Sequence, residues 1–189
     1  MPFTARSRTT SSRATAAAFA LALGVLPLSA LAQDADTIDT DYIKAENALP
    51  PGDVIAVQQV VFKLNHALDA ADYELYGSFF AEDGVFVSGF GNATGPDGVA
   101  AAMEASSAFT VNKRHAATNL IVSGEGDRAV VTSYLIVFER TDSISYVGSA
   151  VNTDTMEKRD GRWLVVEHDS VLDPATAEAT RAAMEGSSN

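Results

Sequence analysis

The chain contains no cysteine, only three histidines, and only 13 basic residues against 25 acidic ones. The absence of cysteine excludes disulfide bonds, thiolate metal sites and a cysteine nucleophile. The formal net charge of −12 disfavours nucleic acid and anionic membranes as partners, because both carry negative charge themselves. Proton chemistry in this chain must therefore use carboxylates, tyrosines or the three histidines, His66, His115 and His168.

The N-terminal segment carries arginines but no acidic residue, and an apolar run over residues 16–31 follows it. Gly24 and Pro27 interrupt this run, which is short for a membrane span. The run closes on Ala30-Leu31-Ala32, a pattern of small residues typical of signal-peptide cleavage. We therefore predict that residues 1–32 are an export signal and that the mature protein is periplasmic or secreted, without membrane attachment.

The rest of the chain is predicted to hold one domain. Residues 33–52 mix acids, small residues and two prolines with little periodicity, which is typical of a loose leader. Residues 53–173 are long enough to bury a sizeable core. Residues 174–189 begin as an alanine-rich helix and end in a small, polar tail.

The first half of the predicted domain has the periodicity of helices. Asp53 is a candidate N-cap, and apolar residues then recur at three- and four-residue spacing at Val54, Val57, Val61, Leu64 and Leu68. The adjacent stripe changes from apolar to polar along the helix and comprises Ile55, Gln58, Phe62, Asn65 and Asp69. This change predicts a helix whose second half lines a cavity.

Two shorter helices are predicted next, one from Tyr73 through Phe80 that ends near Glu82-Asp83-Gly84, and one from Pro96 to Met103. A short strand over residues 85–87 and a glycine-rich loop over residues 89–95 separate them.

The second half of the domain alternates with a period of two residues, which is typical of strands. The predicted strands are joined by short turns rich in Gly, Asp and Ser and cover residues 115–123, 129–140, 145–159 and 162–172. Four strands joined by hairpins form an antiparallel meander. Helices followed by such a meander predict an α+β fold, in which the helices pack on one face of the sheet.

Several motifs occur in an order that resembles a known family. They are Leu68-Asp69-Ala70-Ala71-Asp72-Tyr73, the segment 79–86, Gly95-Pro96-Asp97-Gly98-Val99, Arg114-His115 with Asn119, and Asp160-Gly161-Arg162-Trp163. Over residues 53–173 this order resembles SnoaL-like proteins of the NTF2-like superfamily. The resemblance implies a cone, in which a strongly curved, mostly antiparallel sheet wraps around three N-terminal helices. It also implies a small-molecule pocket at the open end, and a homodimer.

The nearest catalytic resemblance is to the scytalone dehydratase type. In that type an aspartate near the end of the first helix pairs with a histidine on a strand, and Asp69 and His115 match these positions. The type has a second histidine on the next strand, where this sequence has Tyr134.

These residues predict a proton-transfer site. His115 would transfer the proton while Asp69 orients its ring, and Tyr134 would polarise a substrate carbonyl. Asn119 falls on the same strand face as His115 by alternation and is predicted to bind the ligand. The other predicted ligand-binding residues are Tyr73, Phe62 and Asn65.

Structural explanations remain open for the same residues. Asp69 would also be placed to pair with His66 on the helix surface, with His115 as a structural core histidine. His168 and Ser170 share a strand face, but neither metal-ligand spacing nor a nucleophile elbow accompanies them. We therefore predict no metal and no cofactor, and the roles of His66 and His168 stay open.

Two functions are compatible with this sequence. The first is an exported, cofactor-independent lyase or isomerase, such as a dehydratase, that acts on a small apolar or carbonyl-containing molecule through an Asp–His dyad. The alternative is a non-catalytic exported module that binds a ligand, or assists a partner, with the same fold. The sequence does not decide between them.

Overall fold

The structure is a computed structural model that describes residues 40–89, 91–141 and 144–186. The predicted export signal and residues 33–39 of the predicted leader lie outside these residues. In the described part of the chain, no helix is long and apolar enough to cross a membrane.

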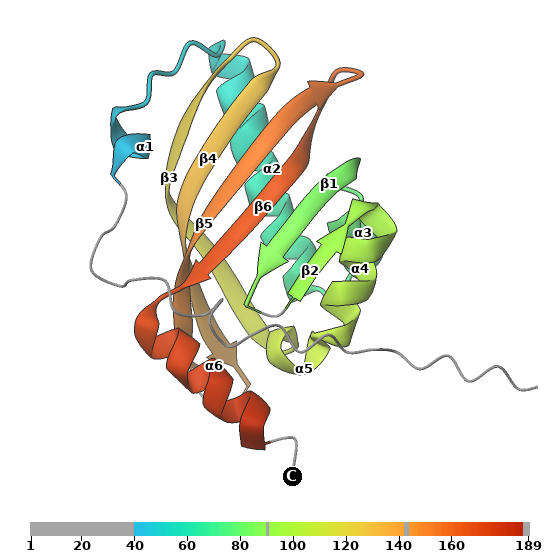
Figure 1. The fold of residues 1–189 in the computed structure, drawn as a ribbon, viewed down its shortest axis with the longest axis vertical. Helices are drawn as coiled ribbons and strands as arrows, with labels where there is room; N and C mark the ends of the chain where they lie inside the picture. Colours follow the sequence, from blue (N-terminus) through green and yellow to red (C-terminus); the bar gives the residue numbers. More distant parts are fainter. Residues whose placement is uncertain (1–39, 90, 142–143, 187–189) are drawn as a thin grey trace, which may run out of the picture. The chain divides into compact units, whose positions relative to one another are not determined.

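The described residues form helices and strands in the order that the sequence predicts, with additions (Figure 1). The helices are α1 (Asp41–Lys44), α2 (Pro51–Asp69), α3 (Tyr73–Gly77), α4 (Gly95–Ala105), α5 (Ser107–Thr110) and α6 (Pro174–Gly186). The strands are β1 (Phe80–Ser88), β2 (Gly91–Thr94), β3 (Lys113–Glu125), β4 (Arg128–Arg140), β5 (Ile144–Arg159) and β6 (Arg162–Leu172).

The six strands form one sheet in the order β2-β1-β6-β5-β4-β3. The long strands β3 to β6 are the predicted meander, and each pairs antiparallel with the next. Strand β1 lies parallel to β6 and pairs antiparallel with β2. Figure 1 shows the sheet curving, with α2 running across it and with α3 and α4 beside β1 and β2. The α+β class and the curved, mostly antiparallel sheet are therefore confirmed.

The segment between α3 and α4 differs from the prediction. The second helix was expected to continue through Phe80 and to end near residues 82–84, but α3 ends at Gly77 and Phe80 begins β1. Strand pairing explains the early end, because the carbonyl of Phe79 accepts a hydrogen bond from the amide of Val165 in β6 at 2.9 Å. The expected loop over residues 89–95 contains β2, which pairs with the end of β1.

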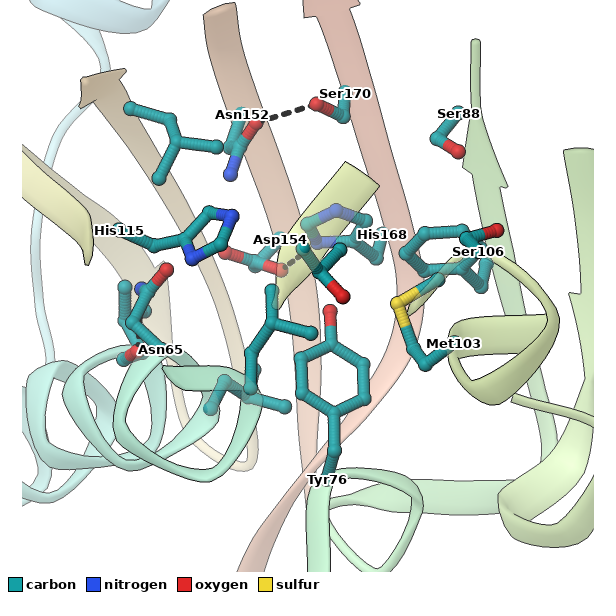
Figure 2. Close-up of a pocket in the computed structure, with 16 residues that line it drawn as sticks. Asn65, Tyr76, Ser88, Met103, Ser106, His115, Asn152, Asp154, His168 and Ser170 are labelled. Atoms are coloured by element: carbon teal, nitrogen blue, oxygen red, sulfur yellow. Dashed lines mark hydrogen bonds and ion pairs between the residues drawn. The ribbon is translucent and has the colours of Figure 1, made fainter. Parts of the chain in front are cut away.

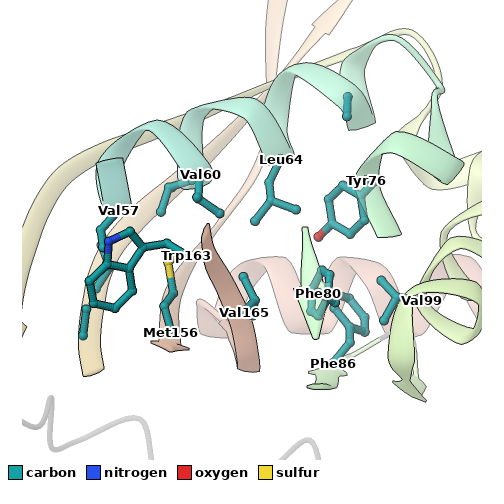
Figure 3. Packing of buried hydrophobic residues seen from close by; sticks show 14 of the residues in the cluster. Val57, Val60, Leu64, Tyr76, Phe80, Phe86, Val99, Met156, Trp163 and Val165 are labelled. Atoms are coloured by element: carbon teal, nitrogen blue, oxygen red, sulfur yellow. The ribbon is translucent and has the colours of Figure 1, made fainter. Parts of the chain in front are cut away.

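The core lies between α2 and the sheet (Figure 3). The buried side chains of α2 recur every three or four residues at Val57, Val60, Val61, Leu64, Ala67 and Leu68. They pack in one cluster with sheet residues that include Met156, Trp163 and Val165. Burying a side chain of this size stabilises a fold by roughly 1.5–3 kcal/mol. The apolar stripe that predicted α2 therefore also holds it on the sheet.

Asp53 anchors the first turn of α2 on the sheet rather than capping the helix. The helix begins at Pro51, and Pro50 occupies the N-cap. The Oδ1 atom of Asp53 accepts hydrogen bonds from Lys158 Nζ at 2.7 Å and from Trp163 Nε1 at 3.0 Å. These two donors, Lys158 first, lower the pKa of the Asp53 carboxyl. The predicted N-cap role is thus replaced by a side-chain bridge from α2 to β5 and β6.

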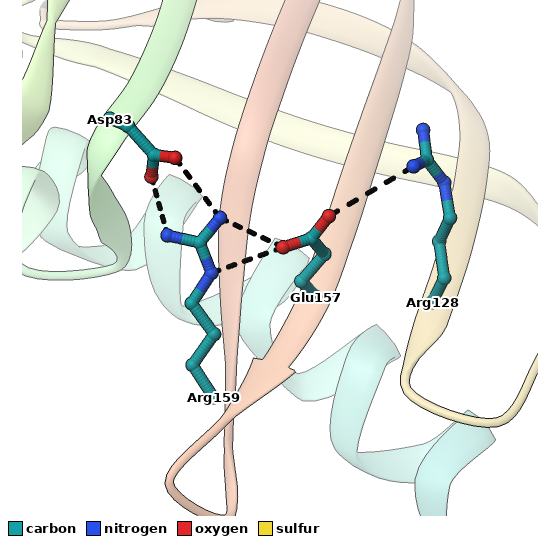
Figure 4. Close-up of polar contacts among 4 residues, drawn as sticks. All are labelled: Asp83, Arg128, Glu157 and Arg159. Atoms are coloured by element: carbon teal, nitrogen blue, oxygen red, sulfur yellow. Dashed lines mark hydrogen bonds and ion pairs between the residues drawn. The ribbon is translucent and has the colours of Figure 1, made fainter.

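A surface network of charged residues joins β1, β5 and β4 (Figure 4). Arg159 contacts both carboxylate oxygens of Asp83 and also bonds Glu157, whose other oxygen lies 3.9 Å from Arg128. The guanidinium of Arg159 lowers the pKa of Asp83. Because Asp83 is largely exposed, these ion pairs add little to the stability of the fold. The network orders neighbouring strand ends more than it stabilises the fold.

Candidate active site

Asp69 and His115 are in direct contact. Asp69 is the last residue of α2, and His115 lies near the start of β3. Asp69 Oδ1 is 2.8 Å from His115 Nδ1 and also accepts a hydrogen bond from the backbone N–H of His115 at 3.0 Å. Asp69 Oδ2 accepts a hydrogen bond from Arg114 at 3.0 Å. The Asp69 side chain is 5 % exposed, so it faces the protein, whereas His66 is exposed on the helix surface.

This contact sets the state of the His115 ring. A carboxylate oxygen only accepts hydrogen bonds, so Nδ1 carries the proton and Nε2 of the neutral ring is an unprotonated base. Burial lowers the pKa of His115 below its ordinary value of 6.5, while Asp69 opposes that shift. His115 is therefore neutral near pH 7, with a carboxylate placed to stabilise the imidazolium once a proton arrives.

A second histidine–aspartate pair, Asp154 and His168, lies on β5 and β6. The two residues face each other in the strand register, and His168 Nδ1 is 2.7 Å from Asp154 Oδ1. Both side chains are buried, Asp154 to 2 % exposure. The ring of His168 stacks on Phe86 of β1 with 5.0 Å between the ring centroids. The sequence analysis left the role of His168 open and did not single out Asp154.

One cavity connects the two pairs (Figure 2). Its volume is about 90 Å³, and His115, Asp154 and His168 all line it. The helices contribute mainly apolar lining residues, among them Val61, Leu64, Leu68 and Met103. The sheet contributes mainly polar ones, among them Ser88, Asn152 and Ser170. A ligand here would have an apolar side against the helices and a polar side against the sheet.

Tyr76 of α3 adds a hydroxyl to the same cavity. Figure 2 shows its oxygen directed toward the Asp154–His168 pair. Burial, and then the nearby Asp154 charge, raise the pKa of Tyr76 well above its ordinary value. The hydroxyl therefore stays protonated at all ordinary pH values and is available as a hydrogen-bond donor.

Of the predicted ligand-binding residues, Asn65 lines the cavity. Its Nδ2 donates a hydrogen bond to the carbonyl of Val61 at 2.9 Å, which fixes the side chain against its own helix. Phe62 does not line the cavity, because it lies on the outer side of α2 and is 38 % exposed. Tyr73 does not line it either, because its ring packs against the core cluster.

The structure places Tyr134 on the opposite face of the sheet from the cavity. His115 is the strand partner of Val137, and paired residues lie on the same face. Leu135 therefore shares the face of His115 and lines the cavity, while Tyr134 points outward and is 42 % exposed. The predicted role of Tyr134 as the donor to a substrate carbonyl has no support in this geometry, and Tyr76 is the tyrosine of the cavity.

Asn119 is also outside the cavity, and a bulge is the reason. The register between β3 and β4 shifts between Thr118 and Ile121, so one residue of β3 is extra. Asn119 has a φ of 54°, in the left-handed region that asparagine tolerates better than most residues. The bulge ends the alternation that placed Asn119 on the face of His115, and Asn119 is exposed.

The described residues contain no group of three or more His, Cys, Asp or Glu side chains that could hold a metal ion. The cavity brings together two histidines that are each paired with an aspartate, a protonated tyrosine, and several amide and hydroxyl groups.

Comparison with known proteins supports the fold. A family model described as SnoaL-like domain matches residues 53–169. A protein of unknown function with a cystatin-like fold from Nostoc punctiforme is 29% identical, with a TM-score of 0.64 over 67% of this chain and 96% of that chain. A structure from Catenulispora acidiphila in complex with S-DNPA is 27% identical, with a TM-score of 0.60 over 68% of this chain and 99% of that chain.

More distant similarity shows the fold alone. ActVI-ORFA from Streptomyces coelicolor is 23% identical, with a TM-score of 0.57 over 64% of this chain and 97% of that chain. A comparison with curated proteins found no match.

Proposed function

The chain belongs to the SnoaL-like domain family, and we propose that its cavity is the active site of a cofactor-independent lyase or isomerase. The substrate would be a small apolar or carbonyl-containing molecule. The observation that carries this proposal is that His115 and His168, each paired with its own aspartate, line the same cavity.

The proposed reaction begins with proton removal. His115 Nε2 takes a proton from the carbon next to the substrate carbonyl, and the bonding electrons move to the carbonyl oxygen. Asp69 stabilises the imidazolium that forms, and the Tyr76 hydroxyl donates a hydrogen bond to the developing oxyanion. In a substrate with a β,γ double bond, the enolate is conjugated with that bond, and the imidazolium returns the proton to the γ-carbon, which gives the conjugated isomer. In a substrate with a β-hydroxyl, the enolate electrons form a double bond between the α- and β-carbons, and the imidazolium protonates the leaving hydroxyl, which releases water.

The second pair extends what the cavity can do. His168 lies on β6, separated from β3 by two strands of the curved sheet, so the two imidazoles line the cavity from different strands. While His115 removes a proton at one position of the substrate, His168 can donate or accept a proton at another position. We assign this second transfer to His168, held by Asp154.

Two further parts of the proposal concern the whole protein. We propose export of the chain from the pattern of residues 1–32, so the reaction would occur outside the cytoplasm. We also propose a homodimer that uses the outer face of the sheet, where Tyr134 and Tyr146 are exposed. Size-exclusion chromatography with light scattering tests the dimer, and the double variant Tyr134→Ser, Tyr146→Ser should weaken it.

Deuterium exchange tests the reaction without knowledge of the natural substrate. The protein is incubated in D₂O with cyclohexanone, and NMR follows deuterium uptake next to the carbonyl. A second reaction uses 3-hydroxycyclohexanone and follows the release of water. Wild-type protein should accelerate at least one of these reactions, and His115→Asn should reduce the acceleration by about 100-fold or more.

The variants are chosen so that the fold is kept. Asparagine places its amide nitrogen near the position of Nδ1, so His115→Asn preserves the hydrogen bond to Asp69. His66→Gln is the matched control, because His66 is exposed on α2, the helix that carries Asp69, and its replacement should leave the rate unchanged. An unchanged rate in His115→Asn would refute the proposed base. Binding of the ketone without any exchange would support the alternative, a non-catalytic ligand-binding module.

A further inference from the structure

A row of polar side chains crosses four adjacent strands on the cavity face of the sheet. Its members are successive strand partners, Ser133 on β4, Asn152 on β5, Ser170 on β6 and Ser88 on β1. Partnered residues lie on the same face of a sheet, about 4.8 Å apart from strand to strand. Ser88, Asn152 and Ser170 all line the cavity.

Asn152 is a cavity-lining member of this row whose side-chain donor is unused. The residue is 7 % exposed, and its Oδ1 accepts a hydrogen bond from Ser170 Oγ at 2.8 Å. The amide nitrogen is on the other side of the group, and Figure 2 shows it directed into the space between His115 and His168. No residue in the described ranges accepts a hydrogen bond from this nitrogen. The nitrogen is open to the cavity, so an acceptor on a ligand can take its hydrogen bond.

The electrostatics of the cavity restrict the acceptor. Asp154 is buried beside the site, and a second charge of the same sign would be repelled strongly in this low-dielectric space. Carboxylate or phosphate ligands are therefore disfavoured, and a neutral carbonyl oxygen fits. The cavity volume of about 90 Å³ and its apolar helix side limit the rest of the ligand to a compact hydrocarbon frame, such as a single ring.

We propose that the Asn152 amide binds and polarises the carbonyl oxygen of a compact, neutral ketone or aldehyde, and that Ser170 is a positioning residue that fixes the orientation of the amide. This inference deepens the proposed function and rests on it, since it names the substrate class and a donor for the same site. Asn152 on the sheet side and Tyr76 on the helix side contribute the two donors that hold the oxygen. The hydrogen bonds strengthen as the carbonyl becomes an enolate, which is the condition for catalysis by such donors.

A pair of matched probes tests the donor without turnover. Acetophenone carries a carbonyl, while α-methylstyrene has the same shape with a methylene group in place of the oxygen. Ligand-observed NMR measures both dissociation constants, and infrared spectroscopy of ¹³C-carbonyl acetophenone reports hydrogen bonding to the oxygen directly. Wild-type protein should prefer acetophenone by about 10-fold, and the carbonyl stretch should move to lower frequency on binding.

Each variant has a distinct expected result. Asn152→Leu should abolish the preference and reverse most of the infrared shift. Ser170→Ala keeps the Asn152 amide but frees its orientation, so the preference should fall to about 3-fold, and Ser170→Thr should restore it. Ser133→Ala is the matched control, because its hydroxyl has no hydrogen-bond partner in the described residues and its loss should change neither readout.

The outcomes separate this inference from the proposed reaction. A preference and an infrared shift that survive in Asn152→Leu would overturn the assignment, as would a wild-type protein that binds both probes equally. Deuterium exchange that fails in wild-type protein, together with an intact carbonyl preference, would contradict the reaction and support the donor.

Discussion

The substitution Asp69→Asn separates the two tasks of the aspartate, which are holding the His115 ring and supplying negative charge. Asparagine has nearly the same shape but only one accepting oxygen. In the wild-type protein Oδ1 accepts from the backbone N–H and from Nδ1 of His115, and Oδ2 accepts from Arg114. The amide oxygen can replace only one of these two carboxylate oxygens.

The surroundings decide which position the amide oxygen takes. If it faces His115, both buried donors stay paired, and the new NH₂ group faces Arg114. Arg114 is 51 % exposed and can turn into water, which costs about 0–1 kcal/mol. If the amide is reversed, the buried backbone N–H loses its acceptor at a cost of about 1–3 kcal/mol. The first orientation is therefore favoured, and His115 keeps its proton on Nδ1.

The size of the effect follows from the charge alone. A hydrogen bond to a charged acceptor is worth about 1.5–3 kcal/mol and a neutral one about 0.5–1.5 kcal/mol, a difference near 1–1.5 kcal/mol. If the imidazolium forms in the transition state, the rate falls by about 5- to 10-fold. The pKa of His115 also falls further, since Asp69 is the group that raises it. A reversed amide would instead move the proton to Nε2, with a loss near the 10⁴-fold seen for the analogous change in a serine protease triad.

Two measurements check this prediction. Long-range ¹H–¹⁵N correlation spectra of histidine-labelled protein show which ring nitrogen is protonated, and the cyclohexanone exchange assay gives the rate. Asp69→Ala is the comparison, because it removes both carboxylate oxygens that accept hydrogen bonds. Nδ1 of His115 should then no longer be the preferred site of the proton, and the rate should fall further than in Asp69→Asn. A rate loss of about 10⁴-fold with a protonated Nε2 in Asp69→Asn would refute the reasoning.

The remaining predictions concern the protonation of His115, the space around two glycines and the processing of the N-terminus. Burial lowers the pKa of His115 in the folded protein below 6.5, so the unfolded chain binds this proton more readily. The contribution of His115 to the free energy of unfolding is therefore fully present above pH 6.5 and is lost as the pH falls below that value. Urea titrations at about pH 7.5 and about pH 5.5 should show a smaller loss for His115→Asn than for wild type. A Cβ at Gly77 would lie 2.2 Å from the backbone oxygen of Pro96, so Gly77→Ala should cost about 1–3 kcal/mol in a thermal melt. Gly52→Ala in α2 meets nothing within 4 Å and should stabilise slightly by the same assay. Mass spectrometry of the exported protein should find Gln33 at the N-terminus, and an uncleaved chain would contradict the export signal.

The elements that the sequence predicts well are those with a strong local period. The three- and four-residue spacing of apolar side chains placed α2, and the two-residue alternation between short turns placed β3 to β6 within a few residues. Asp69 and His115 were proposed together because they match the aspartate and the histidine of the scytalone dehydratase type. The end of α3 depends on pairing with β6, which is distant in sequence, and β2 is a four-residue strand that pairs with the end of β1. Neither feature leaves a local period to detect.

The sequence did not predict correctly which face of each strand lines the cavity. Period two tells which residues share a face but not which face meets the cavity, and Tyr134 was assigned to the wrong one. The bulge at Asn119 then reversed the alternation within β3 itself. A one-residue shift moves every following side chain to the other face, so an error of this kind changes the whole predicted lining.

The Asp154–His168 pair also depends on a bulge that the sequence does not reveal, and here the bulge affects the proposed function. Counting back from the Asp160-Gly161 turn, where Arg159 pairs with Arg162, a regular hairpin would place His168 opposite Thr153. The observed register shifts by one residue between Thr155 and Met156, and this shift places His168 opposite Asp154. A regular strand would therefore leave Asp154 on the other face. The bulge in this hairpin is the feature that turns a single-histidine cavity into one with two paired bases.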